Sequence, residues 1–154
     1  MKVAREQNPQ VAEAWEQQFS NLKGSDLVPF AGLDLAPEST SSGLATAVTI
    51  FRQQTDKSLD SYVVAYIDAQ SSLRETIKPV AHWRVYLTVG AAEEVQFRRN
   101  VTALNGQVGT TMVTQYLIIK GKDLYMLTFS TTVDQAEKYA PTFEKIAQSF
   151  QWVN

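Results

Sequence analysis

His82 is the only histidine of the chain, so it is the first residue to consider for acid–base catalysis or metal binding. One imidazole cannot build the cluster of histidine and carboxylate ligands that a metal centre requires. The surrounding stretch "KPVAHWRV" offers no identifiable group that would orient the ring. We therefore expect His82 to be exposed or hydrogen-bonded within the fold rather than catalytic.

Two pairs of carboxylates have spacings that invite comparison with acid–base sites. Glu93 and Glu94 are adjacent in a predicted strand, where neighbouring side chains point to opposite faces, so they cannot share a proton. Asp56 and Asp60 are four positions apart at the start of a predicted helix. Acidic residues in a first turn ordinarily complement the helix dipole, and we expect that role here.

Basic and aromatic side chains could instead bind a ligand. Arg98 and Arg99 in "FRRN" could meet an anionic partner, but alternation sends them to opposite sides, so one is expected to be solvated. Among the tryptophans, Trp15 belongs to an apolar helical stripe and is expected in the core. Trp83 could stack on a ligand, and Trp152, beyond the last predicted helix, could be a core or a contact residue.

Familiar catalytic and nucleotide-binding motifs are missing from the sequence. It has no cysteine, which excludes disulfides, thiolate zinc sites and cysteine nucleophiles. It has no G-x-S-x-G elbow, and its glycines neither cluster into a phosphate loop nor precede the lysine of such a loop. We accordingly predict no catalytic, cofactor-binding or metal-ligating residue and no cofactor.

Composition favours one globular domain over residues 1–154. The chain has 14 basic and 16 acidic residues, a net charge of -2 and 44% hydrophobic residues, as is ordinary for a folded domain of this size. The basic residues are scattered rather than gathered on one face, which argues against nucleic-acid binding.

No leader or membrane span is visible. "MKVAREQNPQ" lacks the apolar run of a signal peptide, and no apolar stretch is long enough for a membrane helix. We expect a soluble chain, either cytoplasmic or the mature part of an exported envelope protein whose leader was removed.

An amphipathic helix is predicted over residues 8–24. Asn8 and Pro9 suit its start, and Lys23 with Gly24 suits its end. An apolar stripe recurs between them at helical spacing, formed by Val11, Trp15, Phe19 and Leu22. This stripe could bind a partner in a groove. We favour packing on the chain's own sheet, because the connection to the next strand is short.

The following segments predict two strands and a second helix. "DLVPFAGLDLAP" contains proline and glycine, which is typical of an irregular or edge strand, and it could form a hairpin with a strand at 44–51. The helix begins at Asp56 or Ser58 and carries a stripe that includes Leu73 and Ile77. It should end near Lys78, because the next residue is a proline.

Four period-two runs between residues 83 and 129 predict the main sheet: "WRVYLTV", "EEVQFRRNV", "GTTMVTQYLII" and "DLYMLTF". Asn105 with Gly106 predicts a tight hairpin turn between the second and third runs, and Gly121 predicts one between the third and fourth. Consecutive strands should therefore be antiparallel.

A third helix is predicted over 132–150. Thr132 and Gln135 match a capping box, and the segment carries an apolar stripe. Pro141 lies inside it, so we expect a kink or a break into two pieces near Tyr139.

The fold class that follows is α+β, a mostly antiparallel sheet with helices on both faces in an α/β/α sandwich. The run at 123–130 is apolar on both of its faces, so it must be covered above and below. The second and third predicted helices can supply that cover. A lopsided two-layer arrangement is the alternative.

The order of strand, "TDKSLDSY" helix, antiparallel meander, "GKDLYMLTF" and "YAPTFEKIAQSF" resembles the PsbP and DcrB-like group, whose members also include a Ran-binding nuclear import protein. The resemblance covers about residues 44–152, within a core at 27–152. It implies an α/β/α sandwich with accessory, assembly or binding roles rather than one chemistry. The helix at 8–24 departs from it, since many members open with a strand pair that ends in a P-x-G-W turn.

Three functional hypotheses remain. The first is a non-enzymatic accessory, assembly or protein-binding module whose partner is another protein, because no convergent titratable groups are visible. The second is a small-molecule carrier with a pocket between sheet and helices, lined by aromatic residues such as Tyr86, Tyr116 and Tyr125. The third is a weak enzyme whose tyrosine, aspartate and arginine side chains meet only in space.

Overall fold

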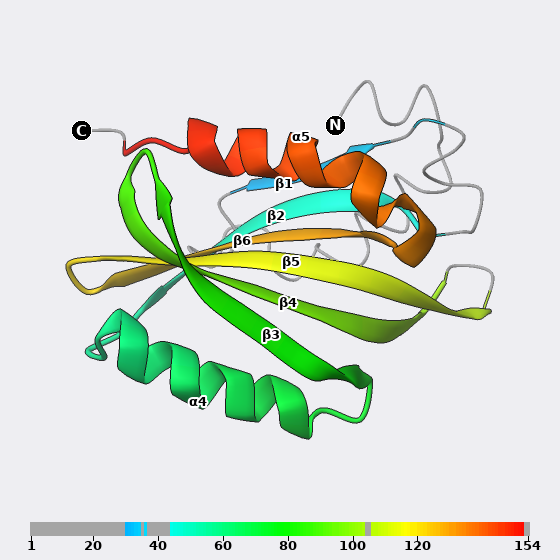
Figure 1. Cartoon of the computed structure of the whole chain (residues 1–154), viewed down its shortest axis with the longest axis horizontal. Coiled ribbons are helices and arrows are strands. Elements are labelled where there is room, and N and C mark those ends of the chain that lie inside the picture. The colour runs from blue at the N-terminus through cyan, green and yellow to red at the C-terminus, as the bar shows by residue number, and fades with distance from the viewer. Residues whose placement is uncertain (1–29, 35, 37–43, 104–105, 153–154) are drawn as a thin grey trace.

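The computed structural model of the chain describes residues 30–34, 36, 44–103 and 106–152, so the helix predicted at 8–24 lies outside the described residues. Six antiparallel strands form one sheet in the order β1-β2-β6-β5-β4-β3 (Figure 1). The strands are β1 (Phe30–Asp34), β2 (Thr46–Gln54), β3 (Thr76–Leu87), β4 (Gly90–Thr102), β5 (Val108–Lys120) and β6 (Asp123–Thr132).

In the part of the chain that the structure describes, two α-helices lie on opposite sides of this sheet (Figure 1). They are α4 (Leu59–Ser72) and α5 (Ala136–Ser149), and α5 follows a single 3-10 turn, η1 (Val133–Gln135). The predicted α+β class and the cover on both faces are therefore confirmed.

Each helix closes its own apolar cluster on the sheet. On the α5 side, Phe143 and Ala147 pack with Tyr116, Leu127 and Phe129. On the α4 side, a separate cluster contains Val63, Val95, Phe97, Val113, Leu117 and Leu124. Strand β6 contributes to both clusters, which is why its sequence is apolar on both faces.

The antiparallel meander matches its prediction closely. β5 and β6 are joined at Gly121, whose φ of 62° is the left-handed conformation that favours glycine. Between β4 and β5 the amide of Gly106 donates to the carbonyl of Ala103 at 2.9 Å, whereas Asn105 of the predicted Asn105-Gly106 turn lies outside the described residues. The hairpin of β1 with β2 is also confirmed, with Phe30 opposite Ile50 and β1 at the edge of the sheet.

The second helix is shorter than predicted. It begins after Ser58, whose side chain accepts a hydrogen bond from the amide of Ser61, but it ends at Ser72 rather than near Lys78. Leu73 is already extended, and β3 begins at Thr76. The β-branched pair at 76–77 favours a strand, and an outer strand tolerates the proline at position 79.

The start of the last helix also differs from its prediction. No side-chain hydrogen bond caps it at Thr132, so the capping box does not form, and the 3-10 turn takes its place. Of the kink or break predicted near Tyr139, the break into two pieces is wrong, because α5 runs as one helix through Pro141. Burial of Phe143 and Ala147 on the sheet outweighs the hydrogen bond that a proline removes.

Candidate functional site

A groove of about 420 Å³ opens between α5 and the outer strands of the sheet, and we call it the α5 groove. Its floor comes from β3, β4 and β5, and its wall comes from α5. The lining residues are Trp83, Val85, Leu87, Glu94, Tyr116, Ala140, Pro141, Glu144 and Gln148.

Strand register brings the polar floor of the groove together. Trp83 on β3 pairs with Glu94 on β4, and Glu94 pairs with Tyr116 on β5. Residues directly opposite each other on neighbouring strands share a face, so the three side chains form one row across the sheet. The row sits under α5, which supplies Glu144 from above.

Glu94 is the half-buried charge of this row. Its carboxylate accepts a hydrogen bond from Gln96 Nε2 at 3.0 Å, and Tyr116 and Trp83 donate to it as well. Burial raises the pKa of Glu94 above its usual range, and the nearby charge of Glu144 adds to this shift. All three donors are neutral, so the carboxylate is hydrogen-bonded without a cation to balance it.

Tyr116 stays protonated beside this carboxylate. The residue is 4% exposed, and burial is the largest cause that raises its pKa, followed by the charges of Glu94 and Glu144. A protonated phenol can only help Glu94 by donating its proton in a hydrogen bond. The floor of the groove therefore holds the Glu94 carboxylate, a hydrogen-bond acceptor, beside the ring of Tyr116.

The far end of the wall is tied to the β3–β4 turn. Thr88 Oγ1 donates to the carbonyl of Gln148 at 2.6 Å, and the Thr88 amide donates to Gln148 Oε1 at 3.1 Å. Together with the buried side chains Phe143 and Ala147, these bonds hold α5 at a set height above the floor. The groove is thus a preformed feature of the fold.

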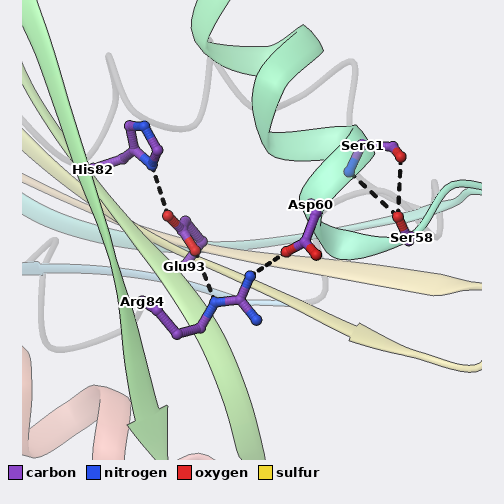
Figure 2. Close-up of polar contacts among 6 residues, drawn as sticks. All are labelled: Ser58, Asp60, Ser61, His82, Arg84 and Glu93. Carbon is purple, nitrogen blue, oxygen red and sulfur yellow. Dashed lines mark hydrogen bonds and ion pairs between the residues drawn. The ribbon is translucent and has the colours of Figure 1, made fainter.

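The opposite face of the same strands carries a chain of polar contacts. His82 Nδ1 lies 2.6 Å from Glu93 Oε1, and Arg84 Nε donates to Glu93 Oε2 at 2.9 Å. Arg84 also forms an ion pair with Asp60 in the first turn of α4 (Figure 2). Glu93 is the buried member, with a side chain 7% exposed, whereas that of His82 is 47% exposed.

This polar chain orients an imidazole but does not surround it with other reactive groups. The contact of the Glu93 carboxylate with Nδ1 fixes the orientation of the His82 ring. Ser58 and Ser61 form a hydrogen bond with each other at the start of α4, on either side of Asp60 in the sequence and without a drawn contact to the polar chain (Figure 2). The sequence missed Glu93 as the partner of His82, although it did place Glu93 and Glu94 on opposite faces.

The remaining charged candidates have local partners or face solvent. Asp56 precedes α4 and forms an exposed ion pair with Lys122 at 3.2 Å. Arg99 donates to Gln70 Oε1 of α4 at 2.6 Å, whereas Arg98 is exposed. The prediction that one of the two arginines is solvated is therefore confirmed.

The aromatic candidates separate into different places. Trp152 packs edge-on against Tyr125 and Phe150 at centroid distances of 5.0 and 5.1 Å, as a contact of the α5-side core. Tyr86 is 76% exposed and does not line the α5 groove. Of the three tyrosines predicted to line one pocket, only Tyr116 does so, and Trp15 lies outside the described residues.

Neither metal binding nor membrane crossing finds a structural candidate in the described part of the chain. Within residues 30–34, 36, 44–103 and 106–152, no three histidine or carboxylate side chains gather closely enough to hold a metal ion. No helix in those ranges is long and apolar enough to span a bilayer.

Comparison with known proteins shows a likeness of fold. No protein-family model matches the chain, and no curated protein matches it by sequence. A crystal structure of PA94 from Pseudomonas aeruginosa, a protein of unknown function described as a candidate regulator, matches with a TM-score of 0.59 at 16% identity. The match covers 72% of this chain and 75% of that one, and at this identity it shows a shared fold alone.

Proposed function

We propose that the chain is a non-enzymatic protein-binding module and that the α5 groove is its binding surface. The observation that carries this proposal is Trp83, a large aromatic side chain that is 40% exposed at the mouth of a preformed groove. Aromatic side chains half-exposed beside a pocket are characteristic anchors of protein interfaces.

The position of the groove adds support. β3 is an outer strand of the sheet, so the groove opens at an edge that another chain can approach. The resemblance to the PsbP and DcrB-like group implies accessory and assembly roles, and we extend it to this chain as part of the proposal. A regulator of the kind named for PA94 would likewise act through a binding surface.

The test is site-directed photo-crosslinking in the native host. A benzoylphenylalanine at position 83 should capture a partner, whereas the same probe at Tyr86, which is exposed and which strand alternation sends to the opposite face of β3, should not. The captured protein is then purified and titrated against the wild type and Trp83→Ala. Equal capture from both positions, or equal affinity of the two proteins, would refute the groove as the binding surface.

A small-molecule carrier is the second candidate, because about 420 Å³ falls within the size range of ligand pockets. Native mass spectrometry of protein purified from its host separates the two ideas. A bound small molecule that is lost in Trp83→Ala would favour the carrier, and its absence would favour the binding module.

The weak-enzyme hypothesis now rests on the oriented His82 and Glu93 rather than on tyrosine, aspartate and arginine in a cleft. An activity that survives His82→Ala would remove it.

A further inference from the structure

The charge in the α5 groove is one-sided. Glu94 and Glu144 both line it, and among the described residues neither carboxylate forms an ion pair. Burial raises the pKa of Glu94, and the charge of Glu144 adds to this shift. A half-buried carboxylate without a counter-charge is unfavourable in the empty groove, and a bound cation would relieve that cost.

The walls beside these carboxylates are apolar and aromatic. Trp83 and Tyr116 flank Glu94 on the neighbouring strands, and Val85, Leu87 and Pro141 complete an aliphatic surface. A small inorganic cation would gain nothing from such walls. A cation on a long aliphatic stem would use them along its whole length.

An arginine side chain fits this combination best. Its planar guanidinium can stack on the Trp83 indole and donate two parallel hydrogen bonds to a carboxylate. Its three methylenes would lie along the aliphatic wall. Lysine offers the same stem but a compact charge that can neither stack nor bind in the bidentate mode.

We propose that the α5 groove recognises an arginine side chain of the partner protein, held between Glu94 and Glu144 and stacked on Trp83. This inference rests on the proposed function and adds the chemistry of the partner to it. The occupant follows from charge complementarity and from the mixed apolar and anionic lining of the groove.

The experiment uses the full chain and three capped tripeptides: acetyl-Leu-Arg-Leu-amide, its lysine counterpart and its citrulline counterpart. Citrulline has the shape of arginine but no charge. Binding is followed by NMR through the indole signal of Trp83, which is assigned by its loss in Trp83→Phe. The indole signal of Trp152, which packs on Tyr125 and Phe150 outside the groove, is the internal reference.

We expect the arginine peptide to shift the Trp83 signal and to bind about tenfold more tightly than the citrulline peptide, as charge-assisted hydrogen bonds would provide. The lysine peptide should fall between them. Glu94→Gln and Glu144→Gln should each reduce the affinity for arginine, and together they should abolish the preference over citrulline. Glu137→Gln, an exposed substitution on α5 outside the groove, is the matched control and should change nothing.

The outcomes separate this inference from the proposed function. Equal binding of the arginine and citrulline peptides would overturn arginine recognition while leaving a peptide-binding groove. A lysine peptide that binds best would replace stacked recognition by a simple charge contact and would also overturn the inference. If no peptide shifts the Trp83 signal at millimolar concentration, the inference fails, and the crosslinking at position 83 then decides the proposed function alone.

Discussion

Glu93 and Glu94 are neighbours on β4, but only Glu93 lies beside basic side chains. This difference decides whether each carboxylate stabilises or destabilises the folded state. Glu93 is 5% exposed and lies between two basic side chains, His82 and Arg84. Glu94 is half-buried among neutral donors and faces a second carboxylate. The first arrangement stabilises the fold, whereas the second makes the ionised carboxylate of Glu94 unfavourable in the folded state.

Glu93, the buried member of the polar chain, should contribute more to the stability of the fold than Asp60, its exposed member. We expect Glu93→Gln to lower the free energy of unfolding by about 1–3 kcal/mol, because an amide cannot accept from both neighbours and leaves a buried group unpaired. Asp60→Asn removes the ion pair with Arg84. Because the Asp60 side chain is 79% exposed, this substitution should lower the free energy of unfolding by no more than about 0.5 kcal/mol. Urea denaturation at neutral pH measures both, and equal losses would contradict the assignment.

Glu94 should make the protein less stable as the pH rises. Because burial raises the pKa of Glu94 in the folded state, the folded state binds its proton more tightly than the unfolded state does. The carboxylate therefore lowers stability at neutral pH, and this penalty is lost as the pH falls to the ordinary glutamate pKa. Glu94→Gln should be more stable than the wild type at pH 7 and equal to it near that lower pKa. Thermal melts of both proteins across the acid pH range test this prediction. A difference in stability between them that does not change with pH would contradict it.

At the scale of elements, the hairpin turns rest on glycines in backbone conformations that other residues adopt with strain. Gly121 joins β5 to β6 with φ of 62°, and Gly90 opens β4 with φ of 122°. A Cβ at either position would meet no atom within 4 Å, so any cost of substitution comes from the backbone alone.

Gly90→Ala should destabilise the protein more than Gly121→Ala. The left-handed conformation of Gly121 costs an alanine about 1 kcal/mol, whereas a φ near that of Gly90 is essentially confined to glycine and should cost about 2 kcal/mol. Denaturant midpoints of the two variants give the order, and the reverse order would show that one turn relaxes to another conformation.

The strands were predictable because their signals are local. Period-two runs and Gly121 each act within a few residues, and β4 to β6 and the second half of β3 follow them. The end of α4 was not, because helical spacing carried the pattern through to Ile77 while the pairing of Ile77 with Arg98 on β4 decided for a strand. Tertiary packing also overrides the local signal at Pro141, because burial of Phe143 and Ala147 keeps α5 a continuous helix.

The candidate groove was less accessible to sequence reasoning than the fold. Trp83, Glu94 and Tyr116 were each noticed, but their meeting depends on the register of two hairpins. That register has a signal in Gly90, which places Leu87 opposite it and so sets Trp83 opposite Glu94. No local pattern places Glu144 and Gln148 above them, because α5 reaches this position by packing on the sheet.

At the scale of the whole molecule, two separate apolar clusters share the central strands. The α5-side cluster depends on Phe143, which stacks on Phe129 at 4.9 Å and is 7% exposed. The α4-side cluster closes over Val63 on the other face. Loss of either cover would leave one face of β5 and β6 open to solvent.

Phe143→Ala should therefore be the most damaging substitution on α5, with a loss of about 3–5 kcal/mol. Ile146→Ala, a neighbour that is 38% exposed, should cost below about 1 kcal/mol and serves as the control on the same helix. Phe143→Leu keeps part of the volume and should fall between them. Chemical denaturation of the three variants checks the order, and a small loss for Phe143→Ala would mean that α5 is not needed to close this core.

The helix that forms the wall of the groove is also the last element of the sheet domain to be synthesised. β3 to β6 are synthesised before residues 136–149, so a nascent chain that lacks α5 presents Tyr116 and Ile118 of β5 and Phe129 of β6 without their cover. A binding surface that needs α5 cannot exist until then. Partner recognition through the α5 groove, as proposed, would thus require synthesis through α5, and a product terminated before residue 136 would expose core where the folded domain has its groove.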